Sequence, residues 1–207
     1  MEKLDLTKHF KSYYTAKSKP ELQYIEKARY LSIQGKGDPS GEEFMQKIQA
    51  LYPVAYALKF AFKAKNRDFV VAKLEGLWWY DESRFTGVSI ADSPTTIPRS
   101  EWEYRLLIRI PDYVTENDVE SAVAATFATK GLPAVGEVSF FEMTEGKVAQ
   151  MLHTGPFDTE VKTLEKLGAF MSERGLSKNG LHHEIYLSDF RKTAPEKLKT
   201  ILREPIK

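Results

Sequence analysis

Apolar residues recur along this chain at two spacings, and each spacing predicts one type of element. Alternation with a period of two is typical of strands, whereas steps of three and four are typical of amphipathic helices. Strands are predicted at 28–34, 69–80, 103–110, 138–143, 148–153 and 183–187. Helices are predicted at 44–62, 115–131 and 161–175, and a short final helix over Leu198, Ile201 and Leu202.

The connections between these elements indicate how the chain is organised. The turn Thr144-Glu145-Gly146 is short, so we expect 138–143 and 148–153 to form a hairpin. Residues 81–100 contain Pro94 and Pro98, and this loop of about 20 residues is long enough to act as a lid or rim. Residues 1–27 are polar and rich in lysine, and we expect an N-terminal arm that packs on the rest only in places.

The order of elements indicates an internal duplication. Residues 28–110 are predicted as strand, Gly-Pro turn, helix, strand, strand, and residues 148–187 begin in the same order. We therefore predict an α+β fold built from duplicated strand-helix-strand-strand modules. The modules would form one antiparallel sheet with helices on one face and a ligand groove between the modules.

Composition excludes several classes of function. The 207 residues contain no cysteine, which excludes disulfides, a thiol nucleophile and cysteine-ligated metals. A net charge of +1 argues against a nucleic-acid partner, and no apolar run reaches the roughly 20 residues of a membrane span. The N-terminus lacks the pattern of a signal peptide, so we expect a cytoplasmic protein. The 3 Trp, 10 Tyr and 12 Phe favour a cavity lined by aromatic rings.

Common cofactor and metal motifs are missing from the sequence. Gly35, Gly37 and Gly41 do not have the spacing of a dinucleotide-binding loop, and no phosphate-binding loop occurs. His182 and His183 are adjacent in a predicted strand, so their side chains point to opposite faces and do not chelate one ion together. We therefore expect no cofactor and no metal.

The remaining candidates are carboxylates among aromatic residues. In the strand 183–187, Glu184 and Tyr186 share one face and Ile185 lies on the other. If Ile185 meets the helices, Glu184 and Tyr186 point out from the open face of the sheet. A solvated Glu–Tyr pair on a strand surface is the alternative interpretation.

The earlier strand 69–80 carries a similar set. Glu75 and Trp79 share a face of that strand, and two similar modules would bring Glu75 and Glu184 together across one groove. The walls of this ligand-binding groove would be Trp78, Trp79, Trp102 and Tyr104. Such a site suits flat, hydrophobic and often cationic molecules, because aromatic faces stack on them and attract positive charge. A partly desolvated Glu also becomes a stronger base.

Four segments resemble the GyrI-like small-molecule-binding family. They are GLWWYDE (76–82), EWEYRLLIRIPDYV (101–114), LHTGPFDTE (152–160) and HEIYLSDFRKTAPEKLKTILR (183–203), of which the last is the most specific. The resemblance implies a domain over 28–207 with two strand-helix-strand-strand modules and a ligand between them. It implies that the family's pocket glutamate corresponds to Glu184 and the neighbouring tyrosine to Tyr186. The chain departs from the family pattern at Phe157 and Phe190, both at turns.

The resemblance leaves three functions open. Some stand-alone members of the family hydrolyse cyclopropane-bearing DNA-alkylating compounds, which implies a cofactor-free hydrolase with Glu184 and Tyr186 as catalytic residues. Other members bind hydrophobic drugs without chemistry, to sequester or sense them. A third kind inhibits DNA gyrase through a protein contact. In the first two cases the partner is a hydrophobic aromatic small molecule, and the oligomeric state is left open.

Overall fold

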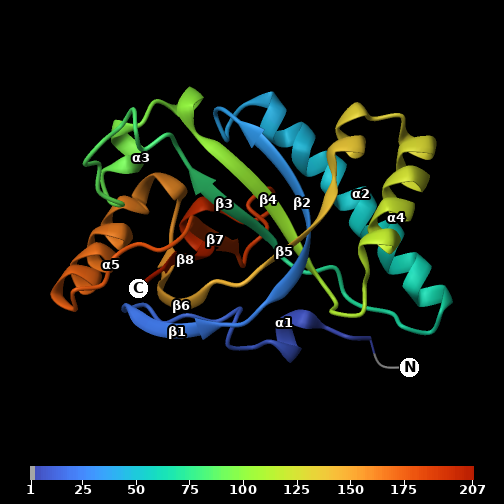
Figure 1. Cartoon of the computed structure of the whole chain (residues 1–207), viewed down its shortest axis with the longest axis horizontal. Coiled ribbons are helices and arrows are strands. Elements are labelled where there is room, and N and C mark those ends of the chain that lie inside the picture. Colours follow the sequence, from blue (N-terminus) through green and yellow to red (C-terminus); the bar gives the residue numbers. More distant parts are fainter. Residues whose placement is uncertain (1–2) are drawn as a thin grey trace.

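Within residues 3–207, which the computed structural model describes, eight strands form a single antiparallel sheet (Figure 1). The strands are β1 (Glu21–Ile25), β2 (Ala28–Lys36), β3 (Leu74–Trp79), β4 (Glu103–Ile110), β5 (Ser139–Met143), β6 (Gly146–Thr154), β7 (His182–Tyr186) and β8 (Lys199–Pro205). The α-helices are α1 (Leu6–His9), α2 (Glu42–Ala64), α3 (Ser93–Thr96), α4 (Glu116–Lys130) and α5 (Val161–Glu173). Single 3-10 turns lie at Arg99–Glu101, Pro133–Glu137, Phe157–Thr159 and Pro195–Lys197.

The strand order confirms the duplicated architecture. The order across the sheet is β1-β6-β8-β7-β3-β4-β2-β5. One module is β2-α2-β3-β4 and the other is β6-α5-β7-β8. Their strands run outward from the central β3–β7 pair in the same sequence, β3-β4-β2 on one side and β7-β8-β6 on the other. The fold is therefore α+β, with the boundary between the modules at the β3–β7 pair.

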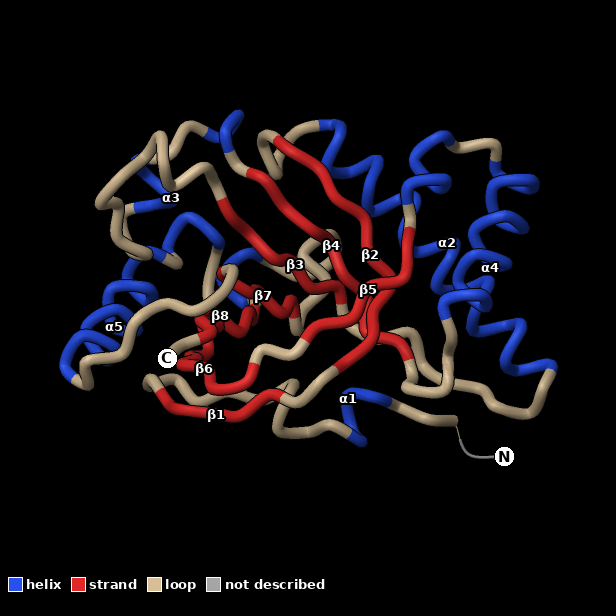
Figure 2. The backbone as a smooth tube through the Cα atoms, viewed as in Figure 1, coloured by secondary structure: helices blue, strands red, loops and turns tan. Residues whose placement is uncertain are grey.

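The long helices lie on one face of this sheet, as predicted. Strand registers place Met151, Leu202, Glu184, Gly76 and Leu106 in one row across five neighbouring strands. Residues directly opposite each other share a face. At one end of the row Met151 packs in a cluster with residues of α5, and at the other end Leu106 packs in the core that contains α2. Figure 2 shows α2 and α4 at one end of the sheet and α5 at the other.

The C-terminal segment corrects one prediction, because Lys199–Pro205 is strand β8 and not a helix. Six of its seven residues are buried, so apolar residues lie on both faces and no period of two appears in the sequence. The three- and four-residue steps between Leu198, Ile201 and Leu202 therefore imitated a helix. Strand β8 is the fourth element of the second module, which the duplication itself required.

The predicted hairpin of β5 and β6 is also wrong. Strand β5 pairs with β2, and β6 pairs with β8 and β1. The register places Ile25 opposite Gly146 and Ala28 opposite Met143, so the connected pair β1–β2 runs antiparallel beside β5–β6. Between the two strands, the carboxylate of Glu145 is held by His183 and Arg203.

The N-terminal segment is more integrated than the predicted arm. Strand β1 is part of the sheet, and Tyr13 and Tyr14 are buried on the face opposite the long helices. The division into an arm at 1–27 and a domain at 28–207 stays a prediction. The expected loop at 81–100 includes helix α3, and its Ile90 packs against the α5 cluster. Among residues 3–207, no helix combines the length and the apolar character needed to cross a bilayer.

Candidate functional site

Strand β7 presents different side chains on its two faces at the boundary between the modules. Glu184 lies opposite Gly76 of β3, on the face that carries the long helices. Ile185 lies opposite Glu75, on the other face. The alternation is as predicted, but the expectation that Ile185 meets the helices is wrong. Both faces of β7 are covered by other parts of the protein. The apolar side chain of Ile185 therefore did not show which face meets the helices.

Three side chains form a hydrogen-bonded chain at this boundary. The indole Nε1 of Trp78 donates to the hydroxyl of Tyr186 across 3.2 Å, and that hydroxyl donates to Oε2 of Glu184 across 2.7 Å. Gly76 makes this arrangement fit, because a Cβ there would lie 2.8 Å from Trp78 Nε1 and 3.1 Å from the Tyr186 oxygen. Trp78 and Tyr186 are buried, whereas the side chain of Glu184 keeps 15% of its surface exposed.

Aromatic rings surround the hydrogen-bonded chain on both sides. Trp78 stacks on Phe44 of α2 at 5.8 Å between centroids, and lies 5.5 Å from Tyr104 and 6.3 Å from Trp102. The structure therefore brings Trp78, Trp102 and Tyr104 together.

On the side of the second module, Tyr186 meets Phe157 and Phe190 edge to face, each at 5.9 Å. Phe157 is 40% exposed and lies at the surface of the cluster. Phe190 belongs to the connection between β7 and β8, whose Arg191 lies over the ring of Tyr52 in α2 at 5.1 Å. This connection therefore joins the two modules over the Glu184 side of the sheet.

Charged groups next to Glu184 complete the site. His182 Nε2 lies 3.4 Å from Glu184 Oε1, and its Nδ1 bonds to Glu204. Burial alone would lower the pKa of His182, but the charges and hydrogen bonds of Glu204 and Glu184 outweigh burial and raise it to about 10. His182 is therefore an imidazolium at neutral pH. Its positive charge compensates the negative charge of the neighbouring carboxylates of Glu184 and Glu204.

Glu160, at the start of α5, is the second acid of the site. Burial, followed by the negative charge of Glu184, raises its pKa well above the ordinary range. Its Oε1 has no hydrogen-bond partner within residues 3–207, and the same holds for Oε2 of Glu204. The environment thus favours the protonated form of Glu160, whereas Glu184 accepts a hydrogen bond from Tyr186, and two carboxyl groups in such different environments can form an acid–base pair.

Sequence reasoning missed Glu160 and His182. Strand alternation already places His182 on the same face as Glu184, so this residue could have been found. Glu160 comes from a different element, after the 3-10 turn Phe157–Thr159, and no spacing rule connects it to β7.

Glu75 and Trp79 do not join this site. Glu75 lies on the opposite face of the sheet, so the prediction that it converges with Glu184 is wrong. In the β3–β7 register Glu75 lies opposite Ile185 and Gly76 lies opposite Glu184, so the two glutamates point to different faces. Trp79 also lies on that opposite face, where its Nε1 donates to Glu103 across 3.1 Å.

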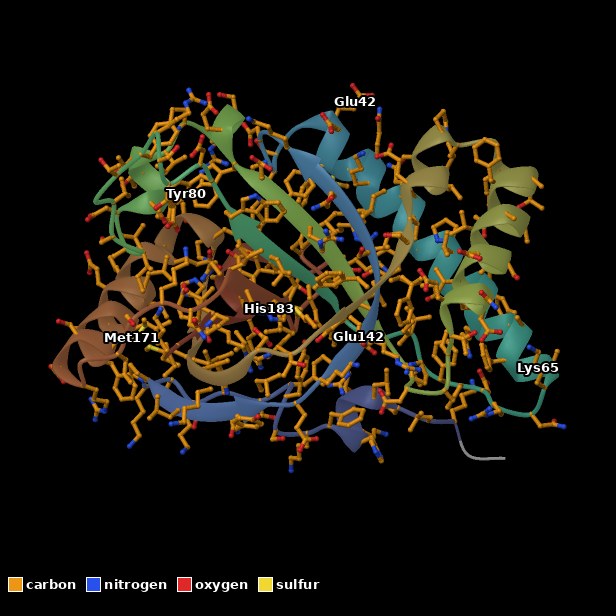
Figure 3. The ribbon with its side chains drawn as sticks, viewed as in Figure 1. Glu42, Lys65, Tyr80, Glu142, Met171 and His183 are labelled. Carbon is orange, nitrogen blue, oxygen red and sulfur yellow. The ribbon has the colours of Figure 1, made fainter. Side chains whose placement is uncertain are left out.

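Glu75 belongs to a buried polar network on the face away from the long helices. Its carboxylate accepts from the hydroxyls of Tyr13 and Tyr14 and contacts Nε2 of His183 at 3.0 Å. Figure 3 shows His183 in the interior, between the two groups of helices. As predicted, His182 and His183 point to opposite faces of β7.

Glu145 and Arg203 continue this buried network. His183 Nδ1 lies 3.0 Å from Glu145, which also accepts from Arg203 at 3.0 Å. Burial would raise the pKa of Glu145, but the positive charges of His183 and Arg203 outweigh it and lower the pKa to about 2. The network is a neutralised, fully buried set whose geometry suits structural support. No three His, Asp or Glu side chains in the described part of the chain are arranged to hold a metal ion.

Comparisons with known proteins agree with this fold. Residues 103–207 match the model of the GyrI-like small molecule binding domain. An uncharacterized conserved protein from Listeria innocua is 37% identical, with 99% of this chain and 100% of that chain covered and a TM-score of 0.87. A hydrolase from Listeria innocua is also 37% identical, with the same coverage and a TM-score of 0.84.

A more distant likeness concerns the fold alone. The C-terminal domain of EcmrR is 11% identical, covers 91% of this chain and 97% of its own length, and has a TM-score of 0.56. A search of curated protein sequences finds no match. Since the family model matches over half of the chain and full-length relatives exceed 30% identity, the chain belongs to the GyrI-like small-molecule-binding family.

Proposed function

We propose that the protein binds flat, hydrophobic aromatic molecules at the Glu184 site and hydrolyses those that carry an electrophilic cyclopropane ring. The observation that carries this proposal is the presence of two carboxyl groups in different environments: Glu184, which accepts from Tyr186, and the buried Glu160, whose pKa is raised by burial and by the charge of Glu184. Membership of a small-molecule-binding family and the 37% identity to a Listeria innocua hydrolase support it.

Binding would use the exposed edge of the aromatic cluster. Phe157 is 40% exposed and Phe190 is half-buried, so a flat ligand would enter beside these rings and stack near Tyr186. Each aromatic contact with a cationic ligand is worth about 0.5–2 kcal/mol. The carboxylates near His182 would favour a ligand with a positive or strongly donating group.

The chemistry would need only water and the two carboxyl groups. Glu184 would take a proton from water while the water oxygen forms a bond to the cyclopropane CH2. The ring C–C bond would break, and its electron pair would move through the conjugated system to the carbonyl oxygen. Glu160 would give its proton to that oxygen, and the proton on Glu184 would return to Glu160 through solvent. The net change is the addition of one water molecule.

Tyr186 would act on Glu184 rather than on the substrate oxygen. Its single proton already goes to Glu184 Oε2, and Trp78 orients its oxygen. This donation would keep Oε1 of Glu184, which lies 3.4 Å from His182 Nε2, directed for proton abstraction. In this proposal Tyr186 therefore orients Glu184, and Glu160 rather than Tyr186 protonates the developing oxyanion.

The test is turnover of a spirocyclopropyl cyclohexadienone by the purified chain. We expect mass spectrometry to detect a product heavier by one water, and Glu184→Gln to abolish its formation above the uncatalysed rate. Glu196→Gln, at an exposed glutamate of the turn Pro195–Lys197, is the matched control and should react like the wild type. If Glu184→Gln hydrolyses the compound as fast as the wild type, this mechanism is wrong.

Binding without chemistry is the second candidate function. The unpartnered carboxyl oxygens of Glu160 and Glu204 favour it, since a cationic ligand could satisfy them without a reaction. In that case titration would show stoichiometric binding, and the ligand would be recovered unchanged after prolonged incubation.

A further inference from the structure

The lysines of the N-terminal segment have no part in the proposed function. Residues 3–19 contain five lysines and only one acidic residue, Asp5, although the whole chain carries a net charge of only +1. The segment lies outside residues 103–207, which match the family model. Its positive charge is therefore a local feature of this part of the chain.

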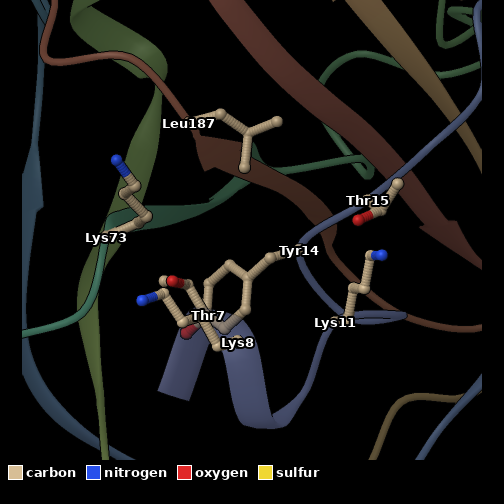
Figure 4. A pocket seen from close by; sticks show the side chains of 7 residues that line it. All are labelled: Thr7, Lys8, Lys11, Tyr14, Thr15, Lys73 and Leu187. Atoms are coloured by element: carbon tan, nitrogen blue, oxygen red, sulfur yellow. The ribbon is translucent and has the colours of Figure 1, made fainter. Parts of the chain in front are cut away.

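Part of this segment lines a cavity of about 500 Å³ (Figure 4). Lys8 and Lys11 come from α1 and the turn after it, and Lys73 comes from the residue before β3. The apolar walls are the ring of Tyr14 and the side chain of Leu187, which follows β7. The cavity therefore combines a flat apolar surface with three ammonium groups around it.

Two of these ammonium groups are available to a ligand. Lys8 lies 3.8 Å from Asp5, whereas Lys11 and Lys73 have no carboxylate within 4.0 Å in the part of the chain that the structure describes. Lys11 is exposed and Lys73 is half-buried. Thr15, also exposed, adds a hydroxyl to the same wall.

This cavity is separate from the Glu184 site. The Tyr14 hydroxyl donates to Glu75 across 3.3 Å, and Glu75 lies on the face of the sheet opposite Glu184. The charges also differ, because carboxylates surround the Glu184 site and lysines surround the cavity. An anionic group is attracted by the lysines of the cavity and disfavoured beside the carboxylates of the Glu184 site.

We propose that this cavity is a second binding site, for a small aromatic molecule that carries a carboxylate or sulfonate group. The ring lies against Tyr14 and Leu187, which removes apolar surface from water. Lys11 and Lys73 lie on opposite sides of the Tyr14 ring (Figure 4). The anionic group lies at the rim of the cavity, where the ammonium group of one of these lysines donates charge-assisted hydrogen bonds to it.

The test compares two probes that share a ring system. 8-Anilinonaphthalene-1-sulfonate carries the anionic group, and N-phenyl-1-naphthylamine lacks it; both fluoresce when they bind to protein. We expect the full chain to bind the sulfonate in a saturable manner at one site. The variant Lys11→Glu/Lys73→Glu should weaken this binding about tenfold, as expected for the loss and reversal of two partly exposed ion pairs, and should leave the neutral probe unchanged.

A matched variant separates a local effect from net charge. Lys130→Glu/Lys166→Glu changes the total charge by the same amount at two exposed lysines of α4 and α5, and should bind the sulfonate like the wild type. Equal weakening in both double variants, equal weakening of both probes, or the absence of saturable sulfonate binding would each overturn the proposal. If Lys73→Glu disturbs folding, as judged by circular dichroism, Lys8→Gln/Lys11→Gln at two exposed lysines replaces it.

Discussion

Tyr186 donates its hydroxyl proton to Glu184 across 2.7 Å, from a position two residues further along the same face of β7. The same hydroxyl accepts the indole N–H of Trp78 from the neighbouring strand. The Glu184 carboxylate is thus oriented by one residue from its own module and, through it, by one from the other module. Five predictions test this arrangement and the buried groups around it.

Tyr186→Phe removes the donor to Glu184 and keeps the ring against Phe157. A hydrogen bond to a charged group is worth about 1.5–3 kcal/mol, so we expect turnover to fall about tenfold to a hundredfold with little change in ligand affinity. Hydrolysis rates and ligand titration measure the two effects. Tyr56→Phe, at an exposed tyrosine of α2, serves as the control. An unchanged rate would show that Tyr186 does not orient Glu184.

Gly76→Ala should displace Trp78. The new Cβ would lie 2.8 Å from Trp78 Nε1, closer than real Cβ contacts come, and overpacking of this kind costs about 1–3 kcal/mol. We expect a lower melting temperature and a shifted tryptophan emission. Gly136→Ala, where a Cβ meets nothing within 4 Å, should leave both unchanged. Identical melting of the two variants would contradict the packing described here.

Glu160→Gln removes the proposed acid and its titration. Because burial raises the pKa of Glu160, the wild type holds the proton at neutral pH and should lose turnover as the pH rises through that pKa. The variant should turn over more slowly and lack this alkaline limb. The measurement is the hydrolysis rate of both proteins as a function of pH. If the variant loses activity at high pH as the wild type does, the acid is a group other than Glu160.

His182→Gln tests the imidazolium beside Glu184. The folded pKa of about 10 lies above the ordinary 6.5, so this histidine stabilises the fold fully below pH 6.5, and its contribution falls as the pH rises towards 10. Urea unfolding at several pH values should show the wild type losing stability over this window more steeply than the variant. Parallel curves would mean that His182 is neutral in the folded protein.

Glu145→Gln tests the buried network on the other face. Its folded pKa of about 2 lies below the ordinary 4.5, so its contribution is present above pH 4.5 and is lost as the pH falls towards 2. Removing the charge of Glu145 leaves the buried positive charges of His183 and Arg203 without this partner, which should lower the free energy of unfolding by about 3–5 kcal/mol. Glu142→Gln, which affects surface pairs with Lys27 and Arg29, should cost less than about 1 kcal/mol. Denaturant unfolding at pH 7 compares them, and equal losses would argue against the network.

The sequence alone determined the local properties of the site. Alternation within β7 placed Glu184 and Tyr186 on one face because successive strand residues point to opposite sides. The repeated order of elements predicted the two modules and the position of the site between them. It also required a third strand in the second module, after β7, but the spacing of Leu198, Ile201 and Leu202 concealed it.

Only the tertiary structure decided which faces and elements meet. Both faces of β7 are buried, so its pattern could not tell whether Glu184 or Ile185 lies towards the helices. The register of β3 against β7 places Glu75 and Glu184 on different faces, and this register depends on how the two modules pair. Glu160 lies at the start of α5, and only the packing of this helix on the sheet brings it to the site. Local periodicity determines which side chains share a face of a strand. Where both faces are buried, the pattern does not show which face meets the helices, and tertiary packing decides it.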